Sequence, residues 1–301
     1  MTILTAPEIF QWPADLAFTI IGILGLGSNG FILYAHYVDF QLRNLFIGQQ
    51  AVADLICCGY FVYQSLIVAT WESVYQGYCF SILWPFLYSN CSSTMLTLII
   101  GFDRLIAIRW PIRYKQESIR RSIQIIGTAL GVVLYPGAQV ILGAMLVKGD
   151  LPLATCNVPT SLSETAAFMV WNRTTTGINI AVVVVYSFLV YSFRRAQKAA
   201  EKHRQIVASI LAVAVCHIFT WTVTTVALFA ASYFAVVAQV YASCYAGILA
   251  VTNNASNGFI YAWRSTQYRS ILCRCCGRSE SSESPLLNHN SDRFGMRTVQ
   301  S

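Results

Sequence analysis

The chain has 301 residues, of which 56% are hydrophobic and only 11% are charged, and its formal net charge is +7. A soluble globular domain has about a quarter charged residues, so this composition excludes an ordinary soluble protein and indicates an integral membrane protein. The basic residues are divided among several loops, which argues against a nucleic-acid-binding surface.

Seven apolar runs are each long enough to cross a hydrocarbon core of about 30 Å. No alternating strand pattern of about ten residues occurs, and lipid does not tolerate unpaired backbone groups. We therefore predict an all-α membrane protein, a seven-transmembrane helix bundle with a short amphipathic C-terminal helix. The predicted spans are residues 16–37, 45–70, 78–101, 123–147, 166–193, 206–232 and 233–263, with the last break at Ser232-Tyr233.

The lysines and arginines predict the orientation of the bundle. With the N-terminus outside, eighteen of the twenty lie on the cytoplasmic side, and only Lys148 and Arg173 lie elsewhere. This is the positive-inside pattern, and residues 1–15 have no basic n-region of a signal peptide. We expect a multi-pass plasma-membrane protein with four parts: an extracellular tail at 1–15, the bundle at 16–263, a membrane-surface helix at 264–276 and a disordered cytoplasmic tail at 277–301.

Polar side chains occur inside three of the apolar runs. Asn29 in the first run indicates either a small-residue packing site or a hydrogen bond to a buried acid on the next helix. Asp54 lies one third of the way across the second run, and an ionisable residue at that depth favours a functional role over packing alone. Four polar side chains at 253–257 must face the bundle interior.

The third run carries different chemistry at its two ends. Cys79 and Arg104 are 25 residues apart, which is about 37 Å along a helix. Cys156 is the single cysteine of the loop at 148–164, so we predict a disulfide between Cys79 and Cys156 rather than two free thiols.

The C-terminal segment offers sites of modification. Cys273, Cys275 and Cys276 follow the last run in a basic segment, which favours palmitoylation over a zinc site. The serines beyond Gly277 are interleaved with acids, so disorder with phosphorylation is the functional interpretation.

Several motifs occur together in one order: Asn29, Asp54 before Leu55, Asp103-Arg104 before the segment 110–114, and Asn257-Gly258-Phe259-Ile260-Tyr261. With these motifs the chain resembles a rhodopsin-like (class A) G-protein-coupled receptor over nearly its whole length apart from the tails. The string at 259–269 is most similar to the nematode serpentine chemoreceptors.

The resemblance implies an activation switch near the cytoplasm. Arg104 is expected to be held by Asp103 at rest and to turn toward Tyr186 and Tyr261 on activation, with Asn257 completing the switch. This movement would open a cytoplasmic cleft for a heterotrimeric G protein.

The resemblance also implies a polar pocket that holds an allosteric sodium ion in many relatives. Its residues here are Asn29, Asp54, Ser93, Asn253 and Asn257. Oxygen atoms around one carboxylate suit a hard cation.

The chain departs from the family pattern in the sixth and seventh spans and at the positions where relatives bind their ligands. In the seventh span, Gly258 stands where the family usually has a proline. The sixth span lacks the family's Trp-x-Pro motif, and either His217 or Val223 takes the place of its tryptophan. Phe86 replaces the acid of amine receptors, and Val251 replaces the retinal-bearing lysine of visual pigments. Amine binding and light sensing are therefore disfavoured, and the candidate ligand-contacting residues are Phe86, Asn90 and His217.

The implied function is a receptor that binds an extracellular small molecule or peptide and activates a heterotrimeric G protein, with arrestin and a receptor kinase as partners of the serine-rich tail. No set of nucleophile, base and orienting residue indicates an enzyme. Two alternatives remain open. One is a ligand-gated seven-span chemoreceptor channel, whose orientation would be inverted, and the other is a non-signalling relative in trafficking or partner binding.

Overall fold

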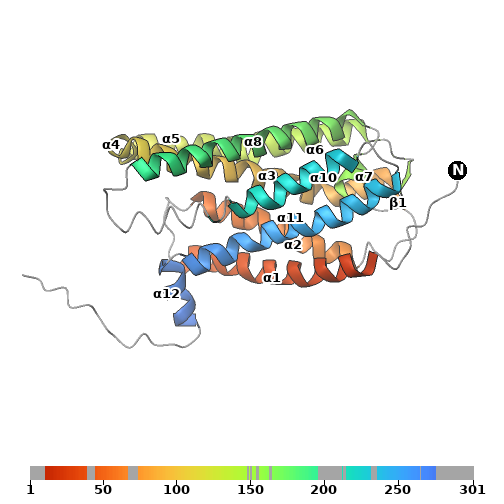
Figure 1. Ribbon diagram of the computed structural model, residues 1–301, viewed down its shortest axis with the longest axis horizontal. Helices are drawn as coiled ribbons and strands as arrows, with labels where there is room; N and C mark the ends of the chain where they lie inside the picture. The colour runs from red at the N-terminus through yellow and green to blue at the C-terminus, as the bar shows by residue number, and fades with distance from the viewer. Residues whose placement is uncertain are drawn as a thin grey trace, which may run out of the picture.

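A computed structural model describes residues 11–38, 45–66, 74–147, 149, 151–153, 156–162, 165–195, 212, 215–231, 236–264 and 266–275. These residues form an elongated bundle of long helices (Figure 1). The elements are α1 (Gln11–Val38), α2 (Leu45–Leu66), β1 (Val74–Tyr75), α3 (Gln76–Arg109), α4 (Pro111–Tyr114), α5 (Glu117–Thr128), η4 (Ala129–Leu134), α6 (Tyr135–Leu146), β2 (Pro152–Leu153), α7 (Val158–Ser161), α8 (Ala166–Arg195), η5 (Ile218–Thr222), α10 (Val223–Ala231), α11 (Val236–Arg264) and α12 (Thr266–Cys275).

Five helical segments of the described chain are long and apolar enough to cross a membrane: Pro13–Val38, Leu45–Leu66, Gln76–Arg109, Glu117–Leu146 and Ala166–Phe193. The predicted sixth and seventh spans correspond to a shorter apolar helix at Val215–Leu228 and to α11, which has 29 residues. An all-α membrane protein is therefore confirmed, and the predicted break at Ser232-Tyr233 lies outside the described residues.

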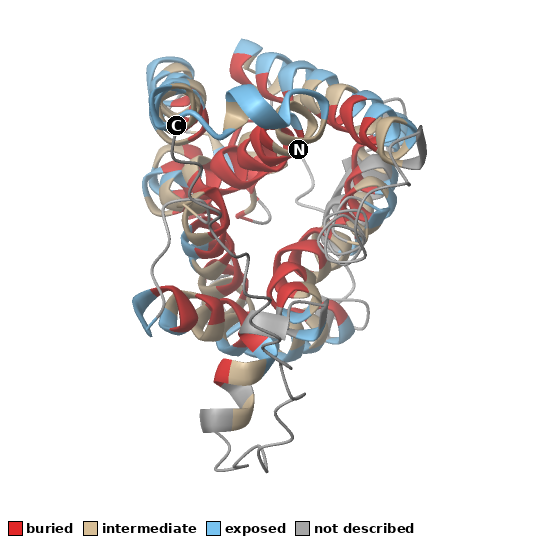
Figure 2. Ribbon diagram, turned by 90° about the vertical axis from the view of Figure 1, so that its left-hand side faces the viewer, coloured by how far each residue is buried: buried red, intermediate tan, exposed pale blue. Residues whose placement is uncertain are grey.

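The burial pattern is that of a protein in a lipid environment. Viewed along the bundle, buried residues face the centre and exposed residues lie on the outside (Figure 2). The exposed residues include many large apolar side chains, which a membrane would cover. Examples are Leu16, Ile20, Ile23, Leu24, Ile141, Met145, Val184, Phe188, Phe219 and Val226.

The central helix α3 joins the two ends of the bundle. It packs against α2, α6 and α8, and more than half of its residues are buried. β1 lies at one end, whereas α4 and α12 lie at the opposite end (Figure 1). We call these the β1 end and the α4 end.

Two π-helical turns interrupt the α-helical pattern. η4 directly precedes α6, whose second residue is Pro136, so the helical irregularity of the fourth span lies one turn before this proline. The Tyr88 hydroxyl donates to the Val132 carbonyl in η4. The second turn, η5, follows His217 in the sixth span. A π-helical turn widens the helix and leaves carbonyl groups free for other donors.

The amphipathic helix predicted at the C-terminal side of the bundle is α12. Tyr268 and Ile271 are buried against α1 and α11, whereas Arg269 is exposed. The predicted disordered tail beyond Gly277 lies outside the described residues.

Candidate functional site

Three helices meet at Asp54 in the middle of the bundle. The side chain of Asp54 on α2 is fully buried. Its Oδ1 accepts a hydrogen bond from the Ser93 hydroxyl of α3 at 2.6 Å, and its Oδ2 accepts one from Asn257 Nδ2 of α11 at 2.8 Å. A buried carboxylate with two donors is therefore the polar link between α2, α3 and α11.

The other two residues of the predicted polar pocket extend this network without bonding to Asp54. Asn29 Nδ2 donates to the Gly25 carbonyl and, across the helix interface, to the Asn254 carbonyl, both at 3.0 Å. Asn253 Oδ1 accepts from the Thr220 hydroxyl at 3.2 Å. Of the two roles open to Asn29, the structure favours packing, because its amide ties α1 to the backbone of α11.

The groups around Asp54 fit a hard monovalent cation chemically. Asn257 Oδ1 is buried without a hydrogen-bond partner among the described residues, although its amide nitrogen is used by Asp54. A carboxylate, the Ser93 hydroxyl and an unpaired amide oxygen are the oxygen ligands that such a cation prefers.

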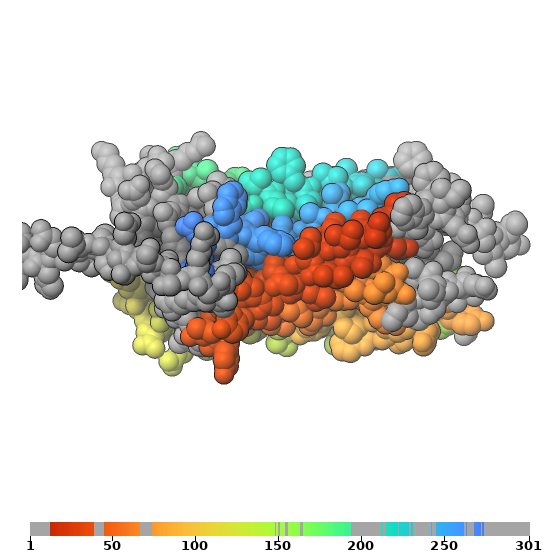
Figure 3. Space-filling model, turned by 90° about the horizontal axis from the view of Figure 1, so that it is seen from below, coloured from red at the N-terminus to blue at the C-terminus, as the bar shows by residue number. Residues whose placement is uncertain are grey.

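Gly258 permits a close approach of α1 and α11. A Cβ atom at this position would lie 2.7 Å from the Ser28 carbonyl carbon, well inside van der Waals distance. Beside it the Ser28 hydroxyl donates to the Ala255 carbonyl at 3.0 Å, and the two helices lie side by side along the surface in Figure 3. α11 continues as a helix through this position, so Gly258 acts in helix packing.

At the α4 end, Asp103 and Arg104 form an ion pair. Arg104 Nε lies 3.6 Å from Asp103 Oδ2, and this buried nitrogen has no hydrogen-bond partner in the part of the chain that the structure describes. The hydroxyl of Tyr114 on α4 donates to Asp103 Oδ1 at 2.7 Å. Burial and the neighbouring Asp103 carboxylate raise the pKa of Tyr114, so this hydroxyl keeps its proton.

The two tyrosines of the predicted switch come from two further helices, α8 and α11. Tyr186 on α8 is buried, and its hydroxyl donates to the Thr97 carbonyl of α3 at 3.1 Å. Tyr261 on α11 is also buried, and its ring lies 6.5 Å from the ring of Tyr268. The structure therefore brings Asp103, Arg104, Tyr186 and Tyr261 to one end of the bundle.

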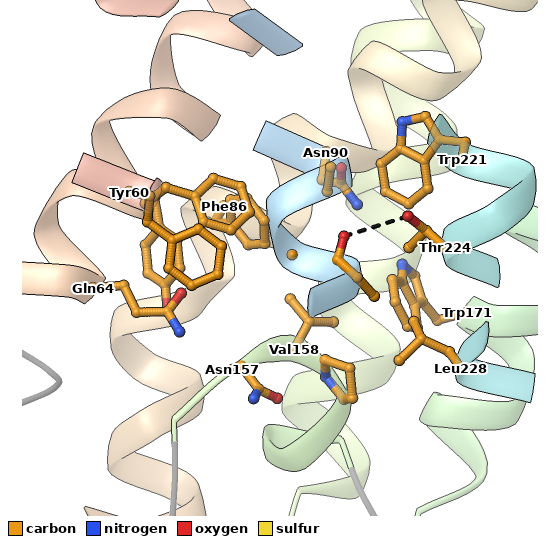
Figure 4. A pocket seen from close by; sticks show the side chains of 16 residues that line it. Tyr60, Gln64, Phe86, Asn90, Asn157, Val158, Trp171, Trp221, Thr224 and Leu228 are labelled. Atoms are coloured by element: carbon orange, nitrogen blue, oxygen red, sulfur yellow. Dashed lines mark hydrogen bonds between the residues drawn. The ribbon is translucent and has the colours of Figure 1, made fainter. Parts of the chain in front are cut away.

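A cavity lies at the β1 end, and it contains about 590 Å³ of space without protein atoms, part of which is open to the surroundings. One wall consists of aromatic residues from α2 and α3, where the rings of Tyr60 and Phe86 stack with centroids 4.5 Å apart. Trp171 of α8 and Trp221 of η5 lie on the opposite side (Figure 4). Its mainly apolar wall with a few polar groups is typical of a small-molecule site.

The segment after Cys156 covers this cavity. The predicted disulfide between Cys79 and Cys156 is confirmed, with the two Cα atoms 5.6 Å apart. β1 pairs with β2 in antiparallel fashion, and Gln76 Nε2 donates to the Ser161 carbonyl at 3.0 Å. Asn157 and the start of α7 thereby reach the cavity wall (Figure 4).

The predicted ligand-contacting residues divide into two groups. Phe86 and Asn90 line the cavity. His217 is not among the lining residues. Its Nε2 is paired with Asn179 Oδ1 at 3.1 Å, and it lies one helical turn away from Trp221. The two tryptophans of the wall were not predicted. They are separated by 50 residues, and only the packing of α8 against η5 brings them together.

The structure describes little of the predicted lipidation site. Cys273 on α12 is a free, half-buried cysteine. The side chain of Cys275 and the whole of Cys276 lie outside the described residues.

Comparison with known proteins gives one family. The model of the family described as "Serpentine type 7TM GPCR chemoreceptor Srsx" matches residues 20–275, a range that begins within the first span and extends to the end of α12. No curated protein matches the chain.

Proposed function

The chain belongs to the Srsx family of serpentine seven-transmembrane chemoreceptors, and we propose that it binds an extracellular ligand and activates a heterotrimeric G protein. The family is a family of receptors rather than of enzymes. The proposal adds a ligand site at the β1 end, coupling to a G protein at the α4 end, and a plasma-membrane location with the N-terminus outside.

The observation that carries the proposal is the Asp103–Arg104 pair at the opposite end of α3 from the cavity. Arg104 is only 20% exposed and its Nε has no hydrogen-bond partner among the described residues. A largely buried guanidinium group held by one carboxylate is costly to desolvate, and its Nε donor is unused. Such a group can exchange its partner when the neighbouring helices move.

In the resting arrangement, Asp103 holds Arg104 while Tyr186 donates to the Thr97 carbonyl. In the active arrangement that we propose, Arg104 leaves Asp103 and meets the Tyr186 and Tyr261 hydroxyls. The vacated space is the binding cleft for the G protein. A ligand drives this change only if it binds the active arrangement more tightly.

The sixth span supplies the movable element. It lacks the proline kink of the wider superfamily, but η5 begins directly after His217 and carries Trp221 into the cavity wall. π-helical turns are weak points at which a helix can change its register. A ligand that contacts Trp221 can therefore rotate the segment that precedes it.

We propose sodium as an allosteric ion at Asp54. Asp54, Ser93 and Asn257 would hold it, and Asn29 and Asn253 would support these residues through the network described above. Its positive charge would offset the buried carboxylate in the resting state. Asn257 would serve both the ion site and the switch.

The remaining proposals concern the membrane and the cytoplasm. Palmitoylation of Cys273, Cys275 and Cys276 would fix α12 to the lipid surface. Phosphorylated serines beyond Gly277 would recruit arrestin after modification by a receptor kinase.

The decisive experiment measures nucleotide exchange on heterotrimeric G proteins in membranes that contain the receptor, with and without ligand pools. Arg104→Ala should reduce exchange to background while surface delivery is retained. The control is Arg121→Ala, because Arg121 pairs with Glu117 at 3.3 Å on an exposed face of α5. Equal exchange in the wild type and Arg104→Ala would contradict the mechanism.

A second measurement tests the orientation. An N-terminal epitope tag should bind antibody on intact cells. A tag that becomes accessible only after permeabilisation would favour the inverted chemoreceptor channels.

A further inference from the structure

The described residues in the wall of the cavity at the β1 end carry no formal charge. Sixteen described residues line it, and none of them is Asp, Glu, Lys, Arg or His. An ion that enters such a cavity loses its hydration and gains no counter-ion, which costs several kcal/mol. The wall therefore discriminates against charged ligands.

The shape of the cavity favours a ring. On one side Phe86 stacks on Tyr60 and meets Phe61 edge to face, with ring centroids 4.5 and 5.1 Å apart. On the other side Trp171, Trp221 and Leu228 face these rings (Figure 4). An aromatic ring placed between the two walls gains both apolar contact and ring–ring attraction.

Three polar atoms in the wall lack a hydrogen-bond partner among the described residues. They are Asn90 Oδ1, the Tyr60 hydroxyl and Trp171 Nε1, and all three are buried. The Thr224 hydroxyl, by contrast, already donates to the Ala246 carbonyl at 3.3 Å, as the dashed line in Figure 4 shows. Leaving a buried polar group unpaired is unfavourable, so a ligand that bonds to Asn90 or Tyr60 removes this penalty.

We propose that the cavity binds an uncharged small molecule that combines one or two aromatic rings with a hydroxyl group. The ring lies between Phe86 and the two tryptophans, and the hydroxyl pairs with the Asn90 amide, which can both donate and accept. This inference rests on the proposed function, since it names the ligand class of the same receptor site. A peptide with charged termini is excluded by the same uncharged wall.

The test compares compounds that differ only in charge. One triplet is 2-phenylethanol, phenylacetate and 2-phenylethylamine, and a second is tryptophol, indole-3-acetate and tryptamine. Each is titrated against the purified full-length receptor in lipid nanodiscs, and binding is measured as the rise in melting temperature. The alcohols should bind at least about a hundredfold more tightly than the charged members of their triplets.

Two variants at one position sharpen the test. Asn90→Leu should weaken binding of 2-phenylethanol about fivefold to tenfold. Asn90→Asp, which keeps the shape of the side chain, should make 2-phenylethylamine the preferred member of its triplet. Gln139→Leu is the control, because Gln139 lies on α6 outside the cavity and donates to Thr174. It should leave the preference of the wild type unchanged.

The outcomes separate this inference from the proposed function. Equal or tighter binding of the acids or amines by the wild type overturns the ligand class, and so does the absence of a shift with both alcohols. If the Asn90 variants do not fold, the order of affinity of the wild type for the alcohol, the acid and the amine of each triplet still tests the proposed ligand class. Nucleotide exchange is measured on the same nanodiscs. Alcohol binding without exchange refutes signalling alone, whereas exchange driven by a charged member refutes the ligand class alone.

Discussion

The contact between α1 and α11 provides a sharp test of the bundle. A methyl group on Gly258 would lie 2.7 Å from the Ser28 carbonyl carbon and 2.7 Å from the Ser28 hydroxyl oxygen. Ordinary van der Waals contact begins at 3.4 Å, so Gly258→Ala requires the helices to separate by about 0.7 Å locally, the difference between the two distances. One of the opposing atoms belongs to the backbone of α1, and a change of rotamer cannot relieve that contact.

The cost of this separation can be worked out from the structure. Overpacking of this kind costs about 1–3 kcal/mol. The Ser28–Ala255 and Asn29–Asn254 hydrogen bonds, both 3.0 Å long, would lengthen beyond hydrogen-bonding range. Each such bond contributes about 0.6 kcal/mol in a membrane protein. We expect Gly258→Ala to lower stability by about 2–4 kcal/mol.

The assay is thermal unfolding of the purified receptor in nanodiscs, in which Gly258→Ala should melt at a clearly lower temperature. Gly30→Ala is the matched control, because Gly30 is also helical and a methyl group there would meet no atom within 4 Å. It should be neutral or stabilising by up to about 1 kcal/mol, since alanine favours the helix. Equal melting temperatures for the two variants would refute the close-approach argument.

Three further predictions concern other parts of the chain. Cys79→Ser and Cys156→Ser should destabilise the receptor equally, by about 4–5 kcal/mol for a loop of 77 residues, and unequal surface delivery of the two variants would show that the bridge is not the cause. Tyr114→Phe removes a hydrogen bond to Asp103 that contributes about 1 kcal/mol. It should therefore raise basal nucleotide exchange roughly fivefold. Unchanged exchange would show that Tyr114 does not stabilise the Asp103–Arg104 pair. Replacing choline chloride by sodium chloride, at a sodium concentration tenfold above Kd, should stabilise the wild type by about 1.4 kcal/mol. The Asp54→Asn variant should not be stabilised. An equal gain in both proteins would show that sodium does not bind at Asp54.

The spans and the disulfide could be predicted from the sequence because each depends on a local or a simple global property. The length of an apolar run can be counted in the sequence, and the thickness of the membrane sets the minimum length of a spanning helix. Cys79 and Cys156 were paired by their depth alone, and the structure joins them. The helices extend beyond the predicted spans, as α3 does to Arg109, because hydropathy reports only the part in lipid.

The role of Gly258 could not be predicted in the same way. Gly258 replaces the proline of the family motif, and this replacement alone suggests only that the seventh helix differs in flexibility. Its actual contact is with Ser28, 230 residues earlier in the chain. Which helices touch, and at what height, is set by the packing of the whole bundle rather than by any local pattern.

The cavity shows the same limit. Phe86 and Asn90 were predicted from the family resemblance and their positions before Arg104, whereas Trp171 and Trp221 face them from helices whose rotation no sequence motif specifies. His217 illustrates the converse, since a polar residue at membrane depth must face the interior but can be satisfied there by another polar residue, here Asn179.

The two ends of the receptor are connected through the residues that these predictions probe. Asn90 lies in the cavity wall, Ser93 bonds to Asp54 one turn further along α3, and Asp103–Arg104 follow on the same helix. A rigid α3 therefore transmits little by itself, because all of these groups would move together. A difference between resting and active states has to arise between α3 and its neighbours, where the cavity wall of α3 faces Trp221 of η5 and where α3 packs against Tyr186 of α8. Variants at these interfaces should change coupling more than variants on the lipid-facing side of α3.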